Sequence, residues 1–290
     1  MNIVTGADGV VGRGVSRALR EAGETVIPVV RRVRPWSHPD SVVCSGPDDP
    51  HWESLGRRPV RAIVHLAAAV PHAAEYPDTE ASAALTRALD RRVAALADAV
   101  AAPLIYMSTC GLYRRTDPAV KDESAALEAA SPYFAAKLEG EALMLTRPAT
   151  TVFRLAAPVG PGLQPGLVVS RFLARARANA DIEVWGSGQR EQDFIDVRDC
   201  GALIVRSLAA PHPGIFNLAS GRAVTMRALA DAVVTAVGGG RVCMVPRPDP
   251  HDNETARYDI TRACNTFQWR PRHDLHESLA VLAREEGTAV

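Results

Sequence analysis

A short apolar strand that breaks into evenly spaced glycines constrains this chain more than any other feature. Ile3 and Val4 lead into a G-x-x-G-x-x-G run formed by Gly6, Gly9 and Gly12. In such a run the first glycine suits a sharp turn, the second lets the backbone approach a pyrophosphate, and the third allows a helix to pack closely on the strand. The run therefore predicts a strand–turn–helix unit that can hold a dinucleotide.

A helix expected from about Val11 to Ala22 completes this unit, with Gly23 as its C-terminal stop. Its N-terminus would offer the positive end of the helix dipole to the cofactor phosphates. The spacing differs from the commoner G-x-G-x-x-G, and an ordinary strand–helix turn is the alternative interpretation. A second strand expected over 25–30 favours the dinucleotide site. The residues predicted to bind the cofactor here are Gly6, Gly9, Val10, Val11 and Gly12.

Strand-like and helical patterns alternate through the first half of the chain, which is typical of βαβ units and a parallel sheet covered by helices. After about Ala156 a cluster of Pro and Gly changes the pattern. We therefore expect an α/β fold. A Rossmann-type doubly wound parallel sheet would occupy 1–156. A smaller mixed α/β C-terminal substrate domain, partly interleaved with the first, would occupy 157–290. The expected strands are 3–5, 25–30, 62–66, 104–108 and 151–155, and the clearest helices are 84–100 and 132–146.

Composition and charge exclude several classes of protein. The chain has 290 residues and a formal net charge of zero, so it carries no electrostatic footprint for nucleic acid or an anionic membrane. No apolar run reaches the length of a membrane span, and no signal peptide is visible. Its five cysteines are scattered without a C-x-x-C pair. This argues against a disulfide framework or a metal site, and a reducing cytoplasm is the expected location.

Tyr133 and Lys137 stand four residues apart and so share one helix face, in a helix that Ser131 would cap. A nearby ammonium lowers the pKa of a phenol, and a nicotinamide cation would lower it further. Tyr133 could then exchange a proton with a carbinol as hydride moves. The hydroxyls of Ser108 and Thr109, at the end of an expected strand, could hold the substrate oxygen. By itself Y-x-x-x-K is common on helix surfaces.

Several segments together resemble the extended short-chain dehydrogenase/reductase family, which includes nucleotide-sugar epimerases, dehydratases and ketoreductases. Segment 6–12 resembles the family's cofactor loop, and 108–113 is similar to its S-S-x-x-V-Y. Further similar segments are 64–68 (V-I-H-L-A-A), 153–161 (the strand before Y-G-P), 192–199 (R-D-F-I-x-V-x-D), 216–221 (Y-N-V-G-S-G) and 259–271 (the closing L-G-W-x-P). The resemblance covers nearly the whole chain.

The resemblance assigns roles to particular residues. Thr109 falls at the catalytic hydroxyl position, Tyr133 at the acid/base, and Lys137 at the residue that lowers the tyrosine pKa and bonds the nicotinamide ribose. Leu66, Ala67 and Ala68 would lie along the cofactor. Cys110 could contact substrate as an extra acid, or be a small buried core residue. Cys110 and Gly111 stand where 4,6-dehydratases show Asp-Glu, which disfavours that reaction.

Departures from the family pattern concern both ligands. Val30 stands where the family has the ribose-binding carboxylate, and Arg31 and Arg32 follow; this suits the 2′-phosphate of NADP, although a solvated loop and NAD remain the alternative. On the substrate side the family's Asn is Ala157 and its R-D-F arginine is Gln192. Both changes weaken the usual hold on a nucleotide diphosphate. The candidate substrate anchors are Gln192, Arg190, Arg257 and Arg247, and His72 is a further candidate for the site.

The sequence thus predicts an NAD(P)-dependent enzyme acting on a nucleotide-linked sugar, with hydride transfer expected at C4. Two net reactions share this step: an epimerase, which the breadth of the family favours, and an NADPH-dependent 4-ketoreductase, which Arg31 and Arg32 favour. A cofactor-sensing protein without turnover is a remote alternative, because the chain keeps both Tyr133 and Lys137. The helices 84–100 and 132–146 are rich in Ala and Leu, and we expect them to form a homodimer interface.

Overall fold

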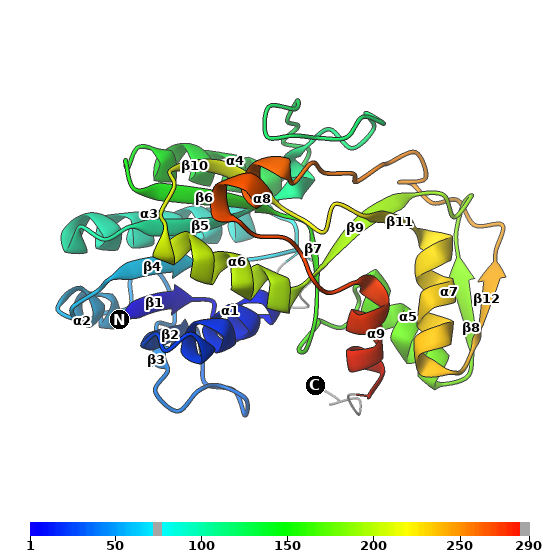
Figure 1. Ribbon diagram of the computed structural model, residues 1–290, viewed down its shortest axis with the longest axis horizontal. Helices are drawn as coiled ribbons and strands as arrows, with labels where there is room; N and C mark the ends of the chain where they lie inside the picture. The colour runs from blue at the N-terminus through cyan, green and yellow to red at the C-terminus, as the bar shows by residue number, and fades with distance from the viewer. Residues whose placement is uncertain (72–76, 285–290) are drawn as a thin grey trace.

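A seven-stranded parallel sheet forms the centre of the molecule (Figure 1). The computed structural model describes residues 1–71 and 77–284. The strand order is β10-β6-β5-β4-β1-β2-β3, and each neighbouring pair is parallel. The strands are β1 (Asn2–Thr5), β2 (Val26–Val30), β3 (Val42–Val43), β4 (Ala62–His65), β5 (Leu104–Thr109), β6 (Thr150–Leu155) and β10 (Gly214–Leu218).

Helices cover both faces of this sheet, as expected for a doubly wound fold. On one face α1 (Val10–Glu21) packs against α6 (Val197–Ala209), and their apolar residues share one core cluster with the sheet. On the other face α3 (Glu80–Val100) lies beside α4 (Pro132–Leu145), with the short α2 (His51–Gly56) next to α3. Their residues form a second core cluster. The predicted fold class is confirmed.

The second half of the chain returns to this sheet before it completes the smaller domain. β10 pairs with β6 at one edge of the sheet, and α6 packs on α1. The division at 156 therefore separates two parts of the sequence but does not separate the sheet from the rest. The sequence patterns had located the inner strands to within a residue or so, whereas β3, α2 and β10 were not predicted.

The smaller domain lies at the right of Figure 1 and has its own apolar core. A three-stranded sheet, β11-β9-β7, leads into it, and a two-stranded sheet pairs β12 with β8. Its elements are β7 (Ala157–Val159), α5 (Val168–Arg177), β8 (Asp181–Val184), β9 (Glu191–Asp196), β11 (Ala223–Thr225), α7 (Met226–Val237), β12 (Arg241–Met244) and α9 (Leu275–Arg284). A further helix, α8 (Thr261–Phe267), packs on β10. Among the described residues, no helix combines the length and apolar character that crossing a membrane requires.

Candidate active site

The glycine run forms a turn that only glycines can make at two positions. Gly6 has φ +66°, and a Cβ there would lie 2.9 Å from the backbone nitrogen of Ala67. A Cβ on Gly12 would lie 2.1 Å from the carbonyl oxygen of Gly6. α1 begins at Val10 with Gly9 as its N-cap, and no side chain caps it. The first N–H groups of the helix thus face an open backbone cradle, which fits the phosphates of a dinucleotide.

The segment after β4 is tied to this turn by hydrogen bonds. Thr5 Oγ1 accepts the backbone N–H of Leu66 at 3.1 Å and that of Ala67 at 3.2 Å. Leu66, Ala67 and Ala68 are each partly exposed. Together with the close approach of Ala67 to Gly6, this places the predicted cofactor residues of two strands side by side.

The end of β2 lies next to the same turn. Val30 is buried, and Arg31 and Arg32 directly after it are exposed. The loop that follows folds back, because the Ser37 hydroxyl donates to Asp8 Oδ2 between the glycines and accepts the N–H of Arg34 at 2.8 Å. The two arginines therefore stand at the rim of the glycine cradle.

Tyr133 lies in the first turn of α4, as its sequence context predicted. The Ser131 hydroxyl accepts the N–H of Phe134 at 3.4 Å, and Pro132 begins the helix. Asp78 Oδ1 accepts the N–H of Tyr133 at 3.1 Å, which ties the helix start to the segment before α3. The helix face formed by Tyr133 and Lys137 therefore has a fixed direction toward the sheet.

Lys137 is buried against β5. Its Nζ lies 3.9 Å from the ring centroid of Tyr106. Burial lowers the pKa of Lys137, although the carboxylates of Asp90 and Glu141 oppose this. Burial also raises the pKa of Tyr133, and Asp90 and Asp78 add to the increase. In the protein by itself Tyr133 is therefore a proton donor, and a further cation beside the phenol would be needed to make it a base at neutral pH.

The three residues predicted around the substrate oxygen differ in their surroundings. Ser108 is buried, and its Oγ has no hydrogen-bond partner among the described residues. Thr109 is partly exposed at the end of β5, where its Oγ1 accepts the N–H of Gly111 at 3.0 Å. Cys110 is fully buried and donates to the carbonyl oxygen of Arg154 at 3.0 Å, and burial raises the pKa of its thiol. We therefore do not retain Cys110 as a substrate contact.

Thr109 and α4 approach each other across Gly111. A Cβ on Gly111 would lie 2.5 Å from the Phe134 ring and 3.3 Å from Thr109 Oγ1. Thr109 Oγ1 and the first turn of α4 therefore approach each other at this glycine. Arg154 of β6 holds α4 against the sheet, because it forms a buried ion pair with Glu141 of α4, with Nη2 to Oε2 at 2.8 Å.

Two of the predicted substrate anchors in the smaller domain are already paired with carboxylates. Arg190 Nε lies 3.0 Å from Asp249 Oδ2, and Arg257 donates to both carboxylate oxygens of Glu191, at 2.5 and 2.8 Å. These arginines are thus not free to bind an anion without giving up an internal partner, a feature that the sequence could not reveal.

Gln192 has a charged neighbour that sequence reasoning missed. Arg115, from the loop after β5, donates from Nη2 to Gln192 Oε1 at 2.9 Å and pairs through Nη1 with Glu254 at 3.0 Å. Arg247 stacks on Trp185, with its guanidinium carbon 3.8 Å from the ring centroid. Ala157 is the first residue of β7. His72 lies outside the described residues.

A buried carboxylate on α3 was also missed. Asp90 of α3 accepts hydrogen bonds from Tyr106 and from His65. A signal was present, since Thr86, Asp90, Val93 and Ala97 recur at the spacing of one helix face. A carboxylate on an otherwise apolar face indicates a buried partner.

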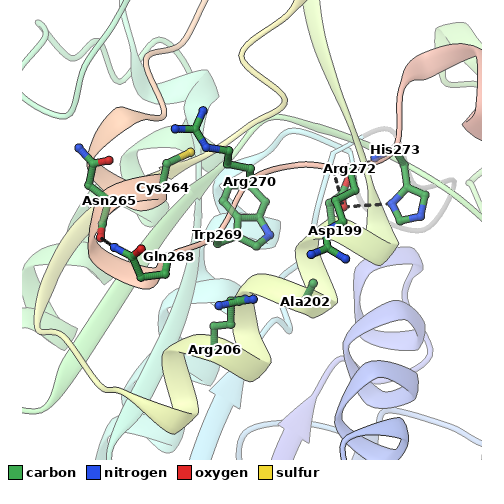
Figure 2. A pocket seen from close by; sticks show the side chains of 10 residues that line it. All are labelled: Asp199, Ala202, Arg206, Cys264, Asn265, Gln268, Trp269, Arg270, Arg272 and His273. Atoms are coloured by element: carbon green, nitrogen blue, oxygen red, sulfur yellow. Dashed lines mark hydrogen bonds and ion pairs between the residues drawn. The ribbon is translucent and has the colours of Figure 1, made fainter.

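A separate cavity of about 560 Å³ lies between α6 and α8 (Figure 2). Asp199, Arg206, Trp269 and His273 are among its lining residues. None of the residues predicted to bind cofactor or substrate lines this cavity, so it lies outside the candidate active site.

A family model for the NAD dependent epimerase/dehydratase family matches residues 2–219. The chain belongs to this family. The match spans the glycine turn, β5, α4 and β10, which are the elements that build the candidate site. The predicted relationship to extended short-chain dehydrogenases is therefore confirmed, and the cofactor named for the family is NAD.

The curated relatives match only part of this chain. UDP-glucuronic acid decarboxylase 2 of Arabidopsis thaliana is 29% identical over 42% of this chain and 28% of its own length. A dTDP-glucose 4,6-dehydratase of Actinoplanes sp. is 25% identical over 61% of this chain and 57% of its own length. The chain thus matches less than two thirds of the length of either relative.

Solved structures share the fold over nearly the whole chain. UDP-glucose 4-epimerase of Thermotoga maritima, solved with UDP-glucose, has a TM-score of 0.83 at 23% identity and covers 98% of this chain and 97% of that chain. The dTDP-glucose 4,6-dehydratase of Bacillus anthracis, solved with NAD, has a TM-score of 0.84 at 18% identity and covers 98% of this chain and 96% of that chain. At these identities the likeness establishes the fold.

Proposed function

We propose that this protein is an NAD-dependent enzyme that transfers hydride between the cofactor and a carbon of a nucleotide sugar. One observation carries the proposal. Thr109 Oγ1 and the first turn of α4, which carries Tyr133, both approach Gly111. Lys137 Nζ lies over the ring of Tyr106 on the same strand as Thr109, and Ser108 Oγ is buried with no hydrogen-bond partner among the described residues. Buried polar groups are normally paired, so this arrangement fits a site built for polar ligands.

Each residue of the candidate site would have its own role in the reaction. When bound, NAD accepts or returns the hydride. Lys137 would donate a hydrogen bond to the nicotinamide ribose, and its positive charge would stabilise the phenolate of Tyr133. Thr109, with Ser108 nearby, would hold the reacting sugar oxygen while Tyr133 takes or gives the proton at that oxygen. Because Tyr133 has a raised pKa in the protein by itself, its activation as a base depends on cations brought close to it.

The choice between NAD and NADP rests on the rim of the cradle. Arg31 and Arg32 are exposed beside the glycine turn, and their cations suit a 2′-phosphate. The family description names NAD. We propose that NAD is accepted and that these arginines determine how well the 2′-phosphate of NADP is tolerated.

The net reaction proposed first is 4-epimerisation, in which the cofactor stays bound and hydride returns to the other face of the sugar. A 4-ketoreductase using NADPH is the second candidate, favoured by Arg31 and Arg32. Dehydration is disfavoured, because Cys110 is buried with an internal partner and Gly111 has no side chain to act as an acid.

A homodimer is proposed as the working assembly. α3 and α4 lie side by side on the outer face of the sheet. Several of their small apolar residues, including Ala84, Ala95 and Ala142, are exposed. A two-fold axis through this face would pair two helices from each subunit. Light scattering at micromolar concentration that gives the mass of one chain would contradict this assembly.

A binding and turnover panel tests the function. Purified protein is heated with NAD, NADP and a set of nucleotide sugars, and a ligand at a hundred times its Kd should stabilise the fold by about 2.7 kcal/mol. An epimerase should release near-stoichiometric cofactor on denaturation and convert its sugar with no cofactor added. A ketoreductase should be isolated largely without cofactor and consume NADPH with a 4-keto sugar. Stabilisation by neither dinucleotide, in protein that also releases no cofactor on denaturation, would contradict the proposal.

A further inference from the structure

A buried carboxylate on α3 contacts the helix that carries the lysine of the candidate site. Asp90 of α3 is 1% exposed. Its Oδ1 lies 2.9 Å from His65 Nε2, and its Oδ2 accepts the hydroxyl proton of Tyr106 at 2.8 Å. A carboxylate in such surroundings is costly to ionise unless charges and donors compensate for the lost water.

The direction of the hydrogen bonds around His65 follows from Thr5. Thr5 Oγ1 accepts the N–H groups of Leu66 and Ala67, so its own proton is left for His65 Nδ1, 2.7 Å away. His65 Nδ1 is then an acceptor, and a neutral His65 carries its proton on Nε2. His65 Nε2–H then donates to Asp90. Every donor in this hydrogen-bond chain, from Leu66 and Ala67 through Thr5 and His65 to Asp90, therefore has an acceptor.

Lys137 approaches this hydrogen-bond chain through Tyr106. Its Nζ lies 3.9 Å from the centroid of the Tyr106 ring, whose hydroxyl is bonded to Asp90. One turn farther along α4, a Cβ on Gly140 would lie 2.0 Å from the Tyr106 hydroxyl and 2.5 Å from Asp90 Oδ2. The helix that carries Lys137 is therefore in direct contact with the carboxylate, and glycine is required for that contact.

We propose that Asp90 is the buried counterion of Lys137, and that the Thr5–His65–Asp90 chain positions it. Asp90, His65 and Thr5 act through Lys137 and are positioning residues. Their role in turnover rests on the proposed function, whereas the ion pairing of Asp90 with Lys137 does not.

The other charges around Lys137 do not replace Asp90. Glu141, on the same helix, is held by the buried guanidinium of Arg154. Tyr133 is neutral with a raised pKa, and Asp78 binds the backbone at the start of α4. Burial acts to raise the pKa of Asp90, but Lys137, followed by His65 and Tyr106, outweighs it, and the pKa lies below its usual value. Asp90 therefore stays ionised at neutral pH.

Asp90→Asn keeps the shape and removes the charge. Without the carboxylate the pKa of Lys137 should fall further, so the basic limb of the pH–kcat profile should move to lower pH by about 1–3 units. The acidic limb, set by Tyr133, should move the same way, because Asp90 also raises the pKa of Tyr133. A structural defect would lower kcat without moving the limbs.

Asp98→Asn is the matched control. Asp98 lies on the same helix and also bridges to the end of α4, through Arg147 Nη2 at 2.6 Å, but it is exposed and distant from this chain. Its substitution should leave both limbs in place. Unmoved limbs in Asp90→Asn, or equal shifts in both variants, would overturn the proposal.

Carbon NMR of the wild-type protein tests the ion pair without turnover and without the variant folding. The Asp90 carboxyl signal should stay in its ionised position down through pH 4, near the ordinary aspartate pKa of about 3.9. A carboxyl that is protonated at neutral pH would overturn the proposal even if the enzyme is active. An ionised Asp90 in a protein that turns over no nucleotide sugar would support the ion pair and refute the proposed function.

Discussion

The two halves of the candidate site hold their polar groups in opposite ways. Ser108 Oγ at the end of β5 is buried with no hydrogen-bond partner among the described residues, and α1 begins at Gly9 without a side-chain cap. In the smaller domain, Arg257 donates two hydrogen bonds to Glu191, and Arg190 Nε lies 3.0 Å from Asp249 Oδ2 as an ion pair, although this nitrogen makes no hydrogen bond among the described residues. The cofactor half is therefore already arranged for a ligand, whereas an anionic substrate would have to displace an internal partner in the other half.

This difference predicts how much each half of the site contributes to the free energy of ligand binding. A preorganised cradle loses little on binding, because its glycines and uncapped helix already have the required geometry. An arginine that exchanges one carboxylate for another anion gains only the difference between the two. We therefore expect substitutions in the cofactor half to have large effects and substitutions of the paired arginines to have small ones.

Tyr133→Phe should give the largest effect. Removing a positioned acid/base lowers turnover by about two to four orders of magnitude. Dinucleotide binding should be unchanged, because the phenol does not hold the phosphates. Steady-state rates and a thermal titration with NAD measure the two properties, and near-native turnover would remove Tyr133 from the mechanism.

Gly12→Ala should disrupt the cradle itself. The new Cβ would lie 2.1 Å from the carbonyl oxygen of Gly6, so the turn must shift, at a cost of about 1–3 kcal/mol or more in the free energy of unfolding. NAD affinity should fall with it. Gly46→Ala is the control, since no heavy atom lies within 4 Å of a Cβ there. Equal melting temperatures for the two variants would contradict the tight turn.

Replacing Arg31 and Arg32 together by Ala should separate the two cofactors. Loss of two cations at the rim should weaken NADP binding by about tenfold or more, since charge-assisted contacts contribute about 1.5–3 kcal/mol each. NAD binding should change little. Calorimetric titration of both dinucleotides provides the measurement, and an equal loss for NAD and NADP would show that the arginines do not recognise the 2′-phosphate.

Arg257→Ala should have the smallest effect. The Arg257–Glu191 pair is half exposed, and exposed ion pairs are typically worth about 0–1 kcal/mol. The KM for a nucleotide sugar should therefore change by less than about fivefold. A much larger increase in KM would show that Arg257 leaves Glu191 to hold the substrate, and that the smaller domain is better prepared for its ligand than its ion pairs indicate.

The same contrast explains what the sequence could predict. Gly6, Gly9 and Gly12 shape a local turn, and Tyr133 and Lys137 are spaced by one helix turn, so short patterns could predict the turn and the helix that carries the pair. β10 could not be placed in this way, because its partner β6 lies far away in the sequence and its own residues give only a weak strand pattern.

Side-chain pairs between residues far apart in the sequence could not be predicted either. Arg115 reaches Gln192 across 77 positions, and Thr5 reaches His65 across 60. Each residue is ordinary in its local context, and its role arises only when the fold brings the segments together. Cys110 shows the reverse: its neighbour Thr109 suggested the site, but the backbone turns the thiol into the core.

Transfer of a labelled hydride tests the central claim most directly. A nucleotide sugar that carries deuterium at C4 is incubated with the purified protein and NAD, and the nicotinamide and the sugar are then analysed by mass spectrometry. In the proposed epimerase the wild type passes deuterium to the bound nicotinamide and returns it to C4. Samples quenched during turnover should therefore contain deuterated cofactor, and the epimerised sugar should keep its label, whereas Tyr133→Phe should form neither at a comparable rate. Conversion of the sugar with no label passing through the nicotinamide would contradict a hydride-transfer enzyme.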